Sequence, residues 1–152
     1  MFEIIRKLLI IGGAVMLLNT PIYAKTSEFQ VVKDTYKWFN KIANEQRMPF
    51  SKEDVAKYFS NDAKMITNNK LVCEGVQQHY EHFVELNKHY KLMQIDIDSI
   101  DWQKAGDRIY LNYLIYAKDT NDQTSKIYVM GYMVVKNGKI ILFNEIIHQE
   151  MT

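Results

Sequence analysis

The stretch that decides the fold is VMGYMVVKNGKIILFNEIIHQE, residues 129–150. On both sides of Asn137 and Gly138 the residues follow the period of two that is typical of β-strands. Asparagine and glycine accept the positive φ angles of a type I′ turn, which joins two antiparallel strands. The stretch therefore predicts a long β-hairpin. Alternation within it places Ile141, Phe143, Glu145 and Ile147 on one strand face.

The same period of two extends back to residue 91. Segments 91–102, 107–119, 125–138 and 139–150 are separated by short polar or glycine-containing turns. Antiparallel strands joined by short turns form a meander. We therefore expect four long strands in this half of the sequence.

The part before residue 91 mostly follows the spacing of helices. Residues 28–44 carry apolar side chains at three- and four-residue steps, which predicts an amphipathic helix. Ser51 and Asp54 have the spacing of a capping box, which opens a second, short helix. The run after Gly75, residues 76–90, predicts a third helix.

Residues 64–75 predict a short hairpin between the second and third helices, turning at Asn68 and Asn69. The order is then helix, helix, hairpin, helix and antiparallel sheet. This order predicts an α+β fold with the three helices packed on one face of the sheet.

Residues 1–24 differ from the rest of the sequence. Arg6 and Lys7 precede the apolar run LLIIGGAVMLL, and the small residue Ala24 closes the segment. This pattern predicts a secretory signal peptide, with a retained membrane anchor as the alternative. We therefore expect a single domain over residues 25–152, located in the periplasm or secreted, without stable membrane insertion after cleavage.

The balance of basic and acidic side chains argues against a basic surface of the kind that binds nucleic acid. Of 19 basic and 18 acidic side chains, Arg6, Lys7 and Glu3 lie in residues 1–24, which leaves 17 of each sign. A neutral chain without a basic block predicts no binding to nucleic acid or to anionic membranes. Cys73 is the only cysteine, and its strand-like surroundings favour a small core residue over a nucleophile.

Several short phrases of the sequence resemble one known family. Phe59, Asp62 and Ala63 form a phrase of the type F-x-x-D-A before the hairpin, Gly75 opens the third helix, and residues 137–140 open the last strand. In this order they resemble the NTF2-like superfamily, and in particular its SnoaL-like branch, over residues 29–150. The resemblance implies a cone, in which a strongly bent sheet wraps the helices around a mostly apolar cavity.

The resemblance also implies where a site would lie. In the enzymes of this superfamily the last strand carries an inward aromatic side chain and then an inward carboxylate, which correspond to Phe143 and Glu145. In the epoxide hydrolase pattern a central strand adds an arginine and an aspartate. Tyr113 and Ile115 occupy those positions here, so the charged pair is missing.

Glu145 is the candidate catalytic residue. Burial in an apolar cone raises the pKa of a carboxyl group toward neutrality, where it can transfer a proton. Ligand binding without catalysis and a purely structural role are the alternatives. The side chains expected to line the cavity and contact a ligand are Tyr36, Phe39, Tyr58, Tyr113, Phe143 and Glu145.

Histidines and aspartates offer weaker candidates. His148 has the opposite strand parity from Glu145, so the two are not expected to form a catalytic pair. His79 and His82 lie three residues apart on a helix, but no third ligand completes a metal site. Asp96 and Asp98 are predicted to share a solvent-exposed strand face, because the sequence around them lacks the other residues of a calcium-binding loop. No metal and no cofactor are expected.

Three functions remain open at this point. The first is a binding domain that takes a small apolar or amphipathic molecule into its cavity. The second is a cofactor-free isomerase, cyclase or lyase that uses Glu145 for proton transfer. The third is a protein-interaction domain without a ligand. Relatives in the superfamily often pair through the outer sheet face, so we also expect a homodimer through the exposed tyrosines of the central strands.

Overall fold

The computed structural model describes residues 27–152, which form three α-helices and seven β-strands. The helices are α1 (Glu28–Ile42), α2 (Lys52–Tyr58) and α3 (Gly75–His89). The strands are β1 (Phe59–Thr67), β2 (Lys70–Glu74), β3 (Tyr90–Ile95), β4 (Asp101–Ala105), β5 (Arg108–Asp119), β6 (Thr124–Lys136) and β7 (Lys139–Met151). None of the helices in this part of the chain is long and apolar enough to cross a membrane. The signal peptide expected over 1–24 lies outside the described residues.

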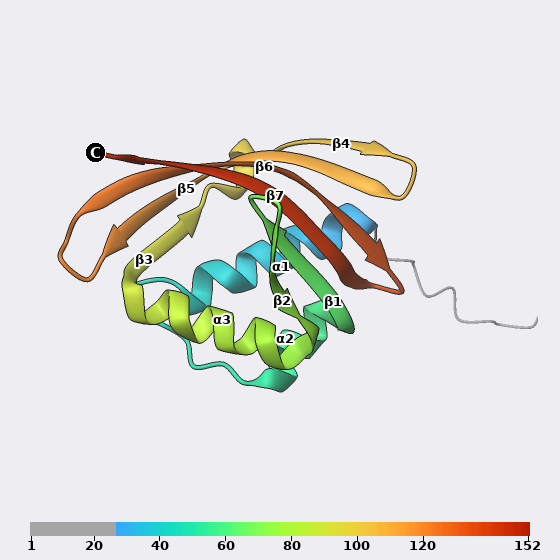
Figure 1. Ribbon diagram of the computed structural model, residues 1–152, viewed down its shortest axis with the longest axis horizontal. Helices are drawn as coiled ribbons and strands as arrows, with labels where there is room; N and C mark the ends of the chain where they lie inside the picture. Colours follow the sequence, from blue (N-terminus) through green and yellow to red (C-terminus); the bar gives the residue numbers. More distant parts are fainter. Residues whose placement is uncertain (1–26) are drawn as a thin grey trace, which may run out of the picture.

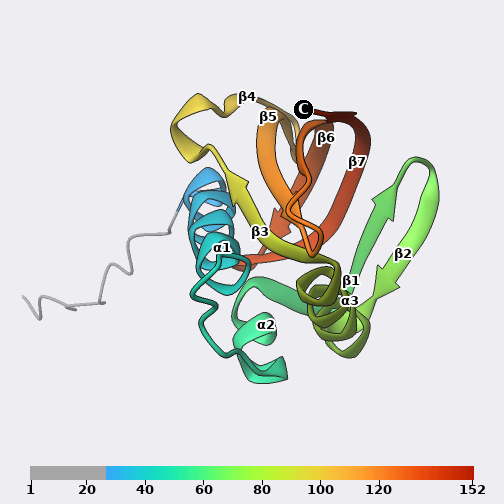
Figure 2. The same cartoon turned by 90° about the vertical axis from the view of Figure 1, so that its left-hand side faces the viewer.

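All seven strands belong to one sheet. Its order is β2-β1-β7-β6-β5-β3, and β4 pairs with β5 beyond this path. Every pair is antiparallel except β1 and β7, which run parallel. The sheet bends over the three helices, with β1 and β2 at one edge and β3 near the other (Figures 1 and 2). The predicted α+β cone with a mainly antiparallel sheet is confirmed.

Side-chain hydrogen bonds fix the helices at their starts and against the sheet. The predicted capping box opens α2: the Ser51 hydroxyl accepts from the backbone N–H of Asp54, and the Asp54 carboxylate accepts from the N–H of Ser51. On α1, the Asn40 side chain donates to the carbonyl of Ile95 (2.9 Å) and accepts from its N–H (2.8 Å). Asn40 thus satisfies the free edge of β3 and ties α1 to the sheet.

Both predicted hairpin turns have the required backbone. Asn137 and Gly138 have φ angles of 52° and 76°, and Asn68 and Asn69 have 50° and 63°. These angles lie in the left-handed region that a type I′ turn needs at both central positions. The turn residues therefore set the register of β6 with β7 and of β1 with β2.

The prediction of one strand over residues 91–102 is wrong. β3 ends at Ile95, a 3₁₀ turn covers Ile97–Ser99, and β4 begins at Asp101. The Ser99 hydroxyl donates to the carbonyl of Asp96 (3.0 Å), which stabilises the turn. This half of the chain therefore holds five strands instead of four, and Asp96 and Asp98 do not share a strand face.

A β-bulge in β7 corrects one position of the predicted inner face. Val135 pairs with Ile140 and Val134 pairs with Leu142, so Ile141 is the extra residue. Ile140 is fully buried, whereas Ile141 is only half-buried. The predicted placement of Ile141 beside Phe143 is wrong, because alternation restarts after the bulge.

Candidate functional site

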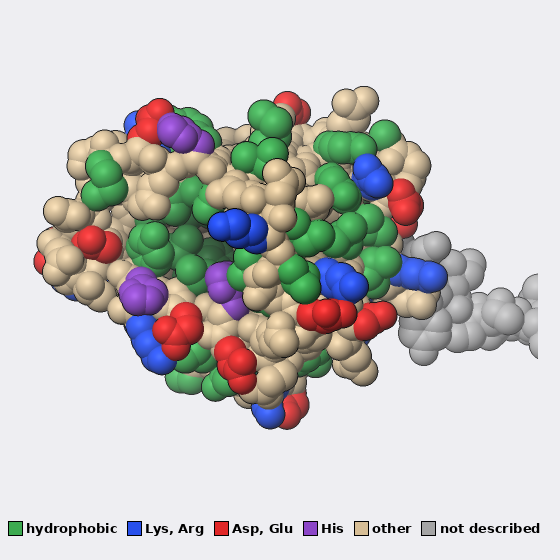
Figure 3. Space-filling view, viewed as in Figure 1, with side chains coloured by type: hydrophobic (Ala, Val, Ile, Leu, Met, Phe, Trp, Pro, Cys, Tyr) green, Lys and Arg blue, Asp and Glu red, His purple; other side chains and the backbone are tan. Residues whose placement is uncertain are grey.

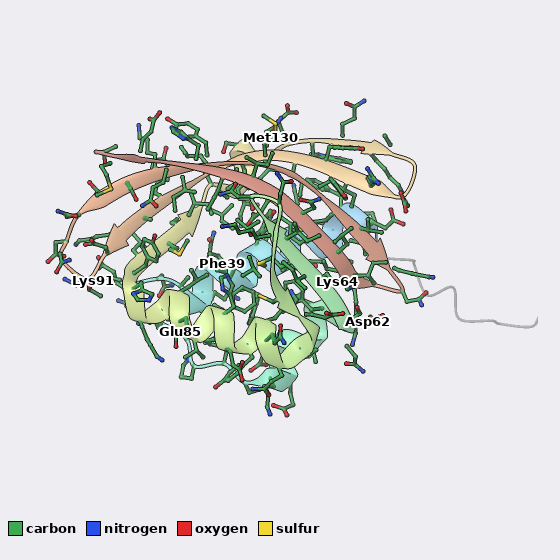
Figure 4. All side chains as sticks on the ribbon, viewed as in Figure 1. Phe39, Asp62, Lys64, Glu85, Lys91 and Met130 are labelled. Atoms are coloured by element: carbon green, nitrogen blue, oxygen red, sulfur yellow. The ribbon has the colours of Figure 1, made fainter. Side chains whose placement is uncertain are left out.

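An apolar cavity of about 210 Å³ lies between the helices and the concave face of the sheet. α1 contributes Tyr36 and Phe39, α3 contributes Phe83, and the strands contribute side chains that include Met133 and Phe143. Figure 3 shows a hollow lined by hydrophobic side chains, with histidines at its edge. Figure 4 shows Phe39 on the helix side of the sheet. The cavity is therefore not filled by the chain's own side chains.

Glu145 of β7 is the acidic side chain of this cavity. The hydroxyl of Thr67, on the neighbouring strand β1, donates to Glu145 Oε1 (2.9 Å). Burial raises the pKa of Glu145 to about 7, although the hydrogen bond from Thr67 and the nearby hydroxyl of Tyr113 both lower it. No Lys or Arg lines the cavity in the described part of the chain, so no cation counters this effect of burial. Near neutral pH the carboxyl group therefore exists in both protonation states.

Two tyrosine hydroxyls lie beside the carboxyl group. The rings of Tyr36 (α1) and Tyr113 (β5) are 4.9 Å apart between centroids. Burial raises the pKa of both phenols well above the usual value, so both remain protonated and able to donate at neutral pH. The Tyr113 hydroxyl lies near Glu145 and interacts with its charge.

Within the described part of the chain, two buried polar atoms on α1 make no hydrogen bond of standard geometry, although the Tyr113 hydroxyl lies close to that of Tyr36. The Tyr36 hydroxyl and Trp38 Nε1 are buried without a hydrogen bond of standard geometry to any described residue. Both side chains line the cavity. A buried donor without a partner costs roughly 1–3 kcal/mol. An acceptor atom on a bound molecule would remove that cost.

All but one of the side chains predicted to contact a ligand line the cavity. Tyr36, Phe39, Tyr113, Phe143 and Glu145 all line the cavity. Tyr58 does not. Its ring instead stacks on Trp38, with the two ring centroids 5.1 Å apart.

The positions that would carry a charged pair in the epoxide hydrolase pattern also face the cavity. Tyr113 and Ile115 on β5 are both buried and both line it. Neither side chain carries charge at neutral pH, so Glu145 has no second carboxylate or arginine beside it on β5. One carboxyl group does not both position a water molecule and protonate a leaving oxygen.

Three of the four histidines lie in clearly different environments. His79 is fully buried, with Nδ1 2.8 Å from the carbonyl oxygen of Gly75, whereas His82 lines the cavity. Burial lowers the pKa of His82, with a smaller effect from His79, so its ring is neutral at pH 7. His148 is exposed beside Tyr128 and Glu150, away from Glu145. Within residues 27–152, no three His, Cys, Asp or Glu side chains come together as a metal site.

Among the cavity residues that were not predicted from the sequence are Thr67, Trp38 and His82. A signal for Thr67 was present, because Ala63 and Met65 of the same strand are buried and alternation points Thr67 to the same side. Trp38 and His82 lie on helices, where the cavity-facing side depends on how each helix packs against the sheet.

No protein-family model matches the chain, and no curated protein matches it in sequence. In structure it is similar to an NTF2-like protein of unknown function from Burkholderia pseudomallei, with TM-score 0.60 and 13% identity over 80% of this chain and 89% of that one. It is also similar to a protein described as a SnoaL-like polyketide cyclase from a Jannaschia species, with TM-score 0.59 and 12% identity over 78% and 85%. A third similar structure is a hypothetical protein with a ketosteroid isomerase-like fold from Catenulispora acidiphila in complex with trimethylamine, with TM-score 0.61 and 8% identity over 76% of this chain and 83% of that one. At identities this low the likeness establishes the fold and leaves function open. The chain has the NTF2-like fold that its sequence resemblance predicted.

Proposed function

We propose that the protein binds a small, mostly apolar molecule that presents a hydrogen-bond acceptor to Tyr36 and Trp38. The observation that carries this proposal is an unfilled apolar cavity, two of whose lining residues have buried donors without a hydrogen bond of standard geometry to the residues that the structure describes. A molecule of this kind gains from apolar burial and satisfies the donors at the same time. The trimethylamine complex of the Catenulispora acidiphila protein supports small-molecule binding by this fold.

Native mass spectrometry of the protein purified from its own host tests this proposal. We expect the folded protein to carry extra mass that is lost on denaturation. The Tyr36→Phe variant should retain less of this molecule, because it removes one of the two free donors. A fully empty wild-type protein would contradict the proposal. The denatured mass also tests our proposal that residues 1–24 are removed during export to the periplasm or the medium.

A second candidate function is cofactor-free proton transfer on the bound molecule, as in an isomerase, cyclase or lyase. The pKa of Glu145, about 7, favours it, because a general base works best with a pKa near the operating pH. The Tyr113 hydroxyl beside it could stabilise a developing oxyanion. With the molecule from the first experiment as substrate, the Glu145→Gln variant should bind it and fail to convert it. Unchanged turnover in the variant would contradict proton transfer by Glu145, and only the binding function would remain.

We further propose that two copies pair through the convex face of the sheet. Met130 and Ile146 lie opposite each other on β6 and β7 and are 65% and 57% exposed. Tyr128 and Tyr110 extend this exposed apolar surface. Figure 4 places Met130 on the side of the sheet opposite to the helices. Apolar and aromatic side chains of this kind form the centres of protein interfaces.

The Met130→Lys variant tests this pairing. A lysine at the centre of the interface has to lose its hydration on association, so we expect the dimer to weaken by about 100-fold or more. Size-exclusion chromatography with multi-angle light scattering, run over a range of protein concentrations, measures the fraction of dimer. Met48→Lys is the matched control, because Met48 is exposed in the segment between α1 and α2 and should leave the dimer intact. A wild-type protein that is monomeric at high concentration would contradict the proposal.

A further inference from the structure

A second space, of about 370 Å³ and polar, lies beside the apolar cavity. Its walls come from the end of α3, the turn between β5 and β6, and the last part of β7. Tyr90 and Gln149 line both spaces, so the two are adjacent at these side chains. The molecule therefore offers an apolar compartment and a polar compartment next to each other.

Hydrogen bonds hold the polar pocket in shape. Asp119 Oδ1 accepts from the backbone N–H groups of Asn121 (2.8 Å) and Gln123 (2.9 Å), which closes the turn. The N–H of Thr120 donates to the carbonyl of His89, which joins this turn to the end of α3. The pocket is thus built on a hydrogen-bonded turn whose ends are fixed in the sheet.

Asp119 is the acidic side chain of the polar pocket, and its carboxylate is bonded within the turn, so the groups left to meet a ligand suit an uncharged partner. No Lys or Arg lines either space among the residues that the structure describes, so an anionic group would find no cation there. Lys91 and Lys118 lie near the turn, but both bind Asp122. Gln149 Nε2 donates to the buried hydroxyl of Ser125 (2.9 Å), which orients the Gln149 amide at the junction of the two spaces. Amide, hydroxyl and backbone groups of this kind bind hydroxyl or amide partners.

We propose, building on the binding function above, that the ligand is amphipathic: its apolar part fills the cavity and its uncharged, hydroxyl- or amide-bearing head group occupies the polar pocket. The sizes agree with this division. A buried apolar cavity of about 150 Å³ holds a benzene molecule. The cavity of about 210 Å³ accommodates a larger apolar group, such as a medium-length alkyl chain.

Four probes with the same eight-carbon chain test the head-group preference: octyl glucoside, octyl phosphate, octyltrimethylammonium and 1-octanol. Each is titrated below its micelle concentration, by calorimetry, into the protein freed of any co-purified ligand. We expect octyl glucoside to bind at least about tenfold more tightly than the two charged probes. The phosphate has to lose its hydration without meeting a cation, and the Asp119 carboxylate, which could face the ammonium, already accepts two backbone N–H groups in the turn. Methyl glucoside, which lacks the chain, should not bind measurably.

Variants locate the head group. Gln149→Ala should weaken octyl glucoside by about tenfold and weaken 1-octanol less, because a sugar head group makes more contacts in the polar pocket than a single hydroxyl does. Gln103→Ala is the matched control, because Gln103 is an exposed strand glutamine that lines neither space. Equal affinities for all octyl probes, or no effect of Gln149→Ala on octyl glucoside, would overturn the head-group site and leave the binding function standing. Failure of all four octyl probes to bind would overturn both proposals.

Discussion

The Glu145→Gln variant is expected to be more stable than the wild-type protein at pH 8, by roughly 2–3 kcal/mol in the free energy of unfolding. The reason is the pKa of Glu145, which burial raises to about 7 from an ordinary value of 4.5. Above pH 7 the folded wild-type protein has to hold a buried carboxylate, and the unfolded chain holds it in water. Glutamine keeps the shape of the side chain, can still accept from Thr67, and carries no charge.

The sign of the pH dependence follows from proton binding. Between pH 4.5 and 7 the folded wild-type protein binds more protons at Glu145 than the unfolded chain does, so its stability falls as pH rises through this window. Below pH 4.5 the carboxyl group is neutral in both states, and the two proteins should converge. Urea unfolding at pH 4, 6 and 8 measures the difference.

Glu150→Gln is the control for this experiment. Glu150 lies on the same strand as Glu145, but its side chain is about half exposed beside His148. Its removal should leave the free energy of unfolding nearly unchanged at all three pH values. A wild-type protein and a Glu145→Gln variant with parallel pH profiles would contradict the assignment of a raised pKa to Glu145.

The Gly131→Ala substitution should cost about 3 kcal/mol or more of stability, at the upper end of the range for overpacking. Gly131 of β6 pairs with Glu145 of β7. A Cβ atom at this position would lie 2.2 Å from the backbone oxygen of Asn144 and 2.8 Å from the Cα of Glu145. The obstacles are main-chain atoms of a paired strand, so they cannot rotate away. Glycine therefore lets the two strands approach closely where the sheet bends.

Gly106→Ala is the matched control. Gly106 has a φ of 61°, and a Cβ atom there would meet nothing within 4 Å. Its replacement should cost only the strain of a left-handed alanine, about 1 kcal/mol. Thermal and urea unfolding of both variants give the comparison. If Gly131→Ala costs no more than Gly106→Ala, the close approach of β6 and β7 is not a constraint on the fold.

The parts of the fold that were predicted correctly depend on local chemistry. The turns at Asn68-Asn69 and Asn137-Gly138 follow from residue types that accept positive φ. The capping box at Ser51 follows from side-chain spacing. The prediction of a single strand over residues 91–102 failed because residues 95–98 alternate like a strand, although β3 ends at Ile95 and a 3₁₀ turn covers Ile97–Ser99. Alternation alone does not distinguish these cases.

The site was predictable to the extent that strand alternation determines it. Phe143 and Glu145 are two residues apart on β7 and both face the cavity, and Tyr113 on β5 faces them. The bulge at Ile141 has no clear sequence signal, because the four apolar residues 140–143 fit either register. His82 and Trp38 were missed because a helix has apolar residues on more than one side, and only packing decides which side meets the cavity.

The parallel pairing of β1 with β7 has a consequence for folding. Thr67 and Glu145 are 78 residues apart in sequence and meet across these two strands. β7 is the last of the seven strands to leave the ribosome, and until then β1 and β6 each have an unpaired edge. Such edges invite mispairing and aggregation, and contacts between distant residues slow folding. The carboxyl group and the hydroxyl that binds it therefore come together in one late step, so partly folded chains contain no preformed site.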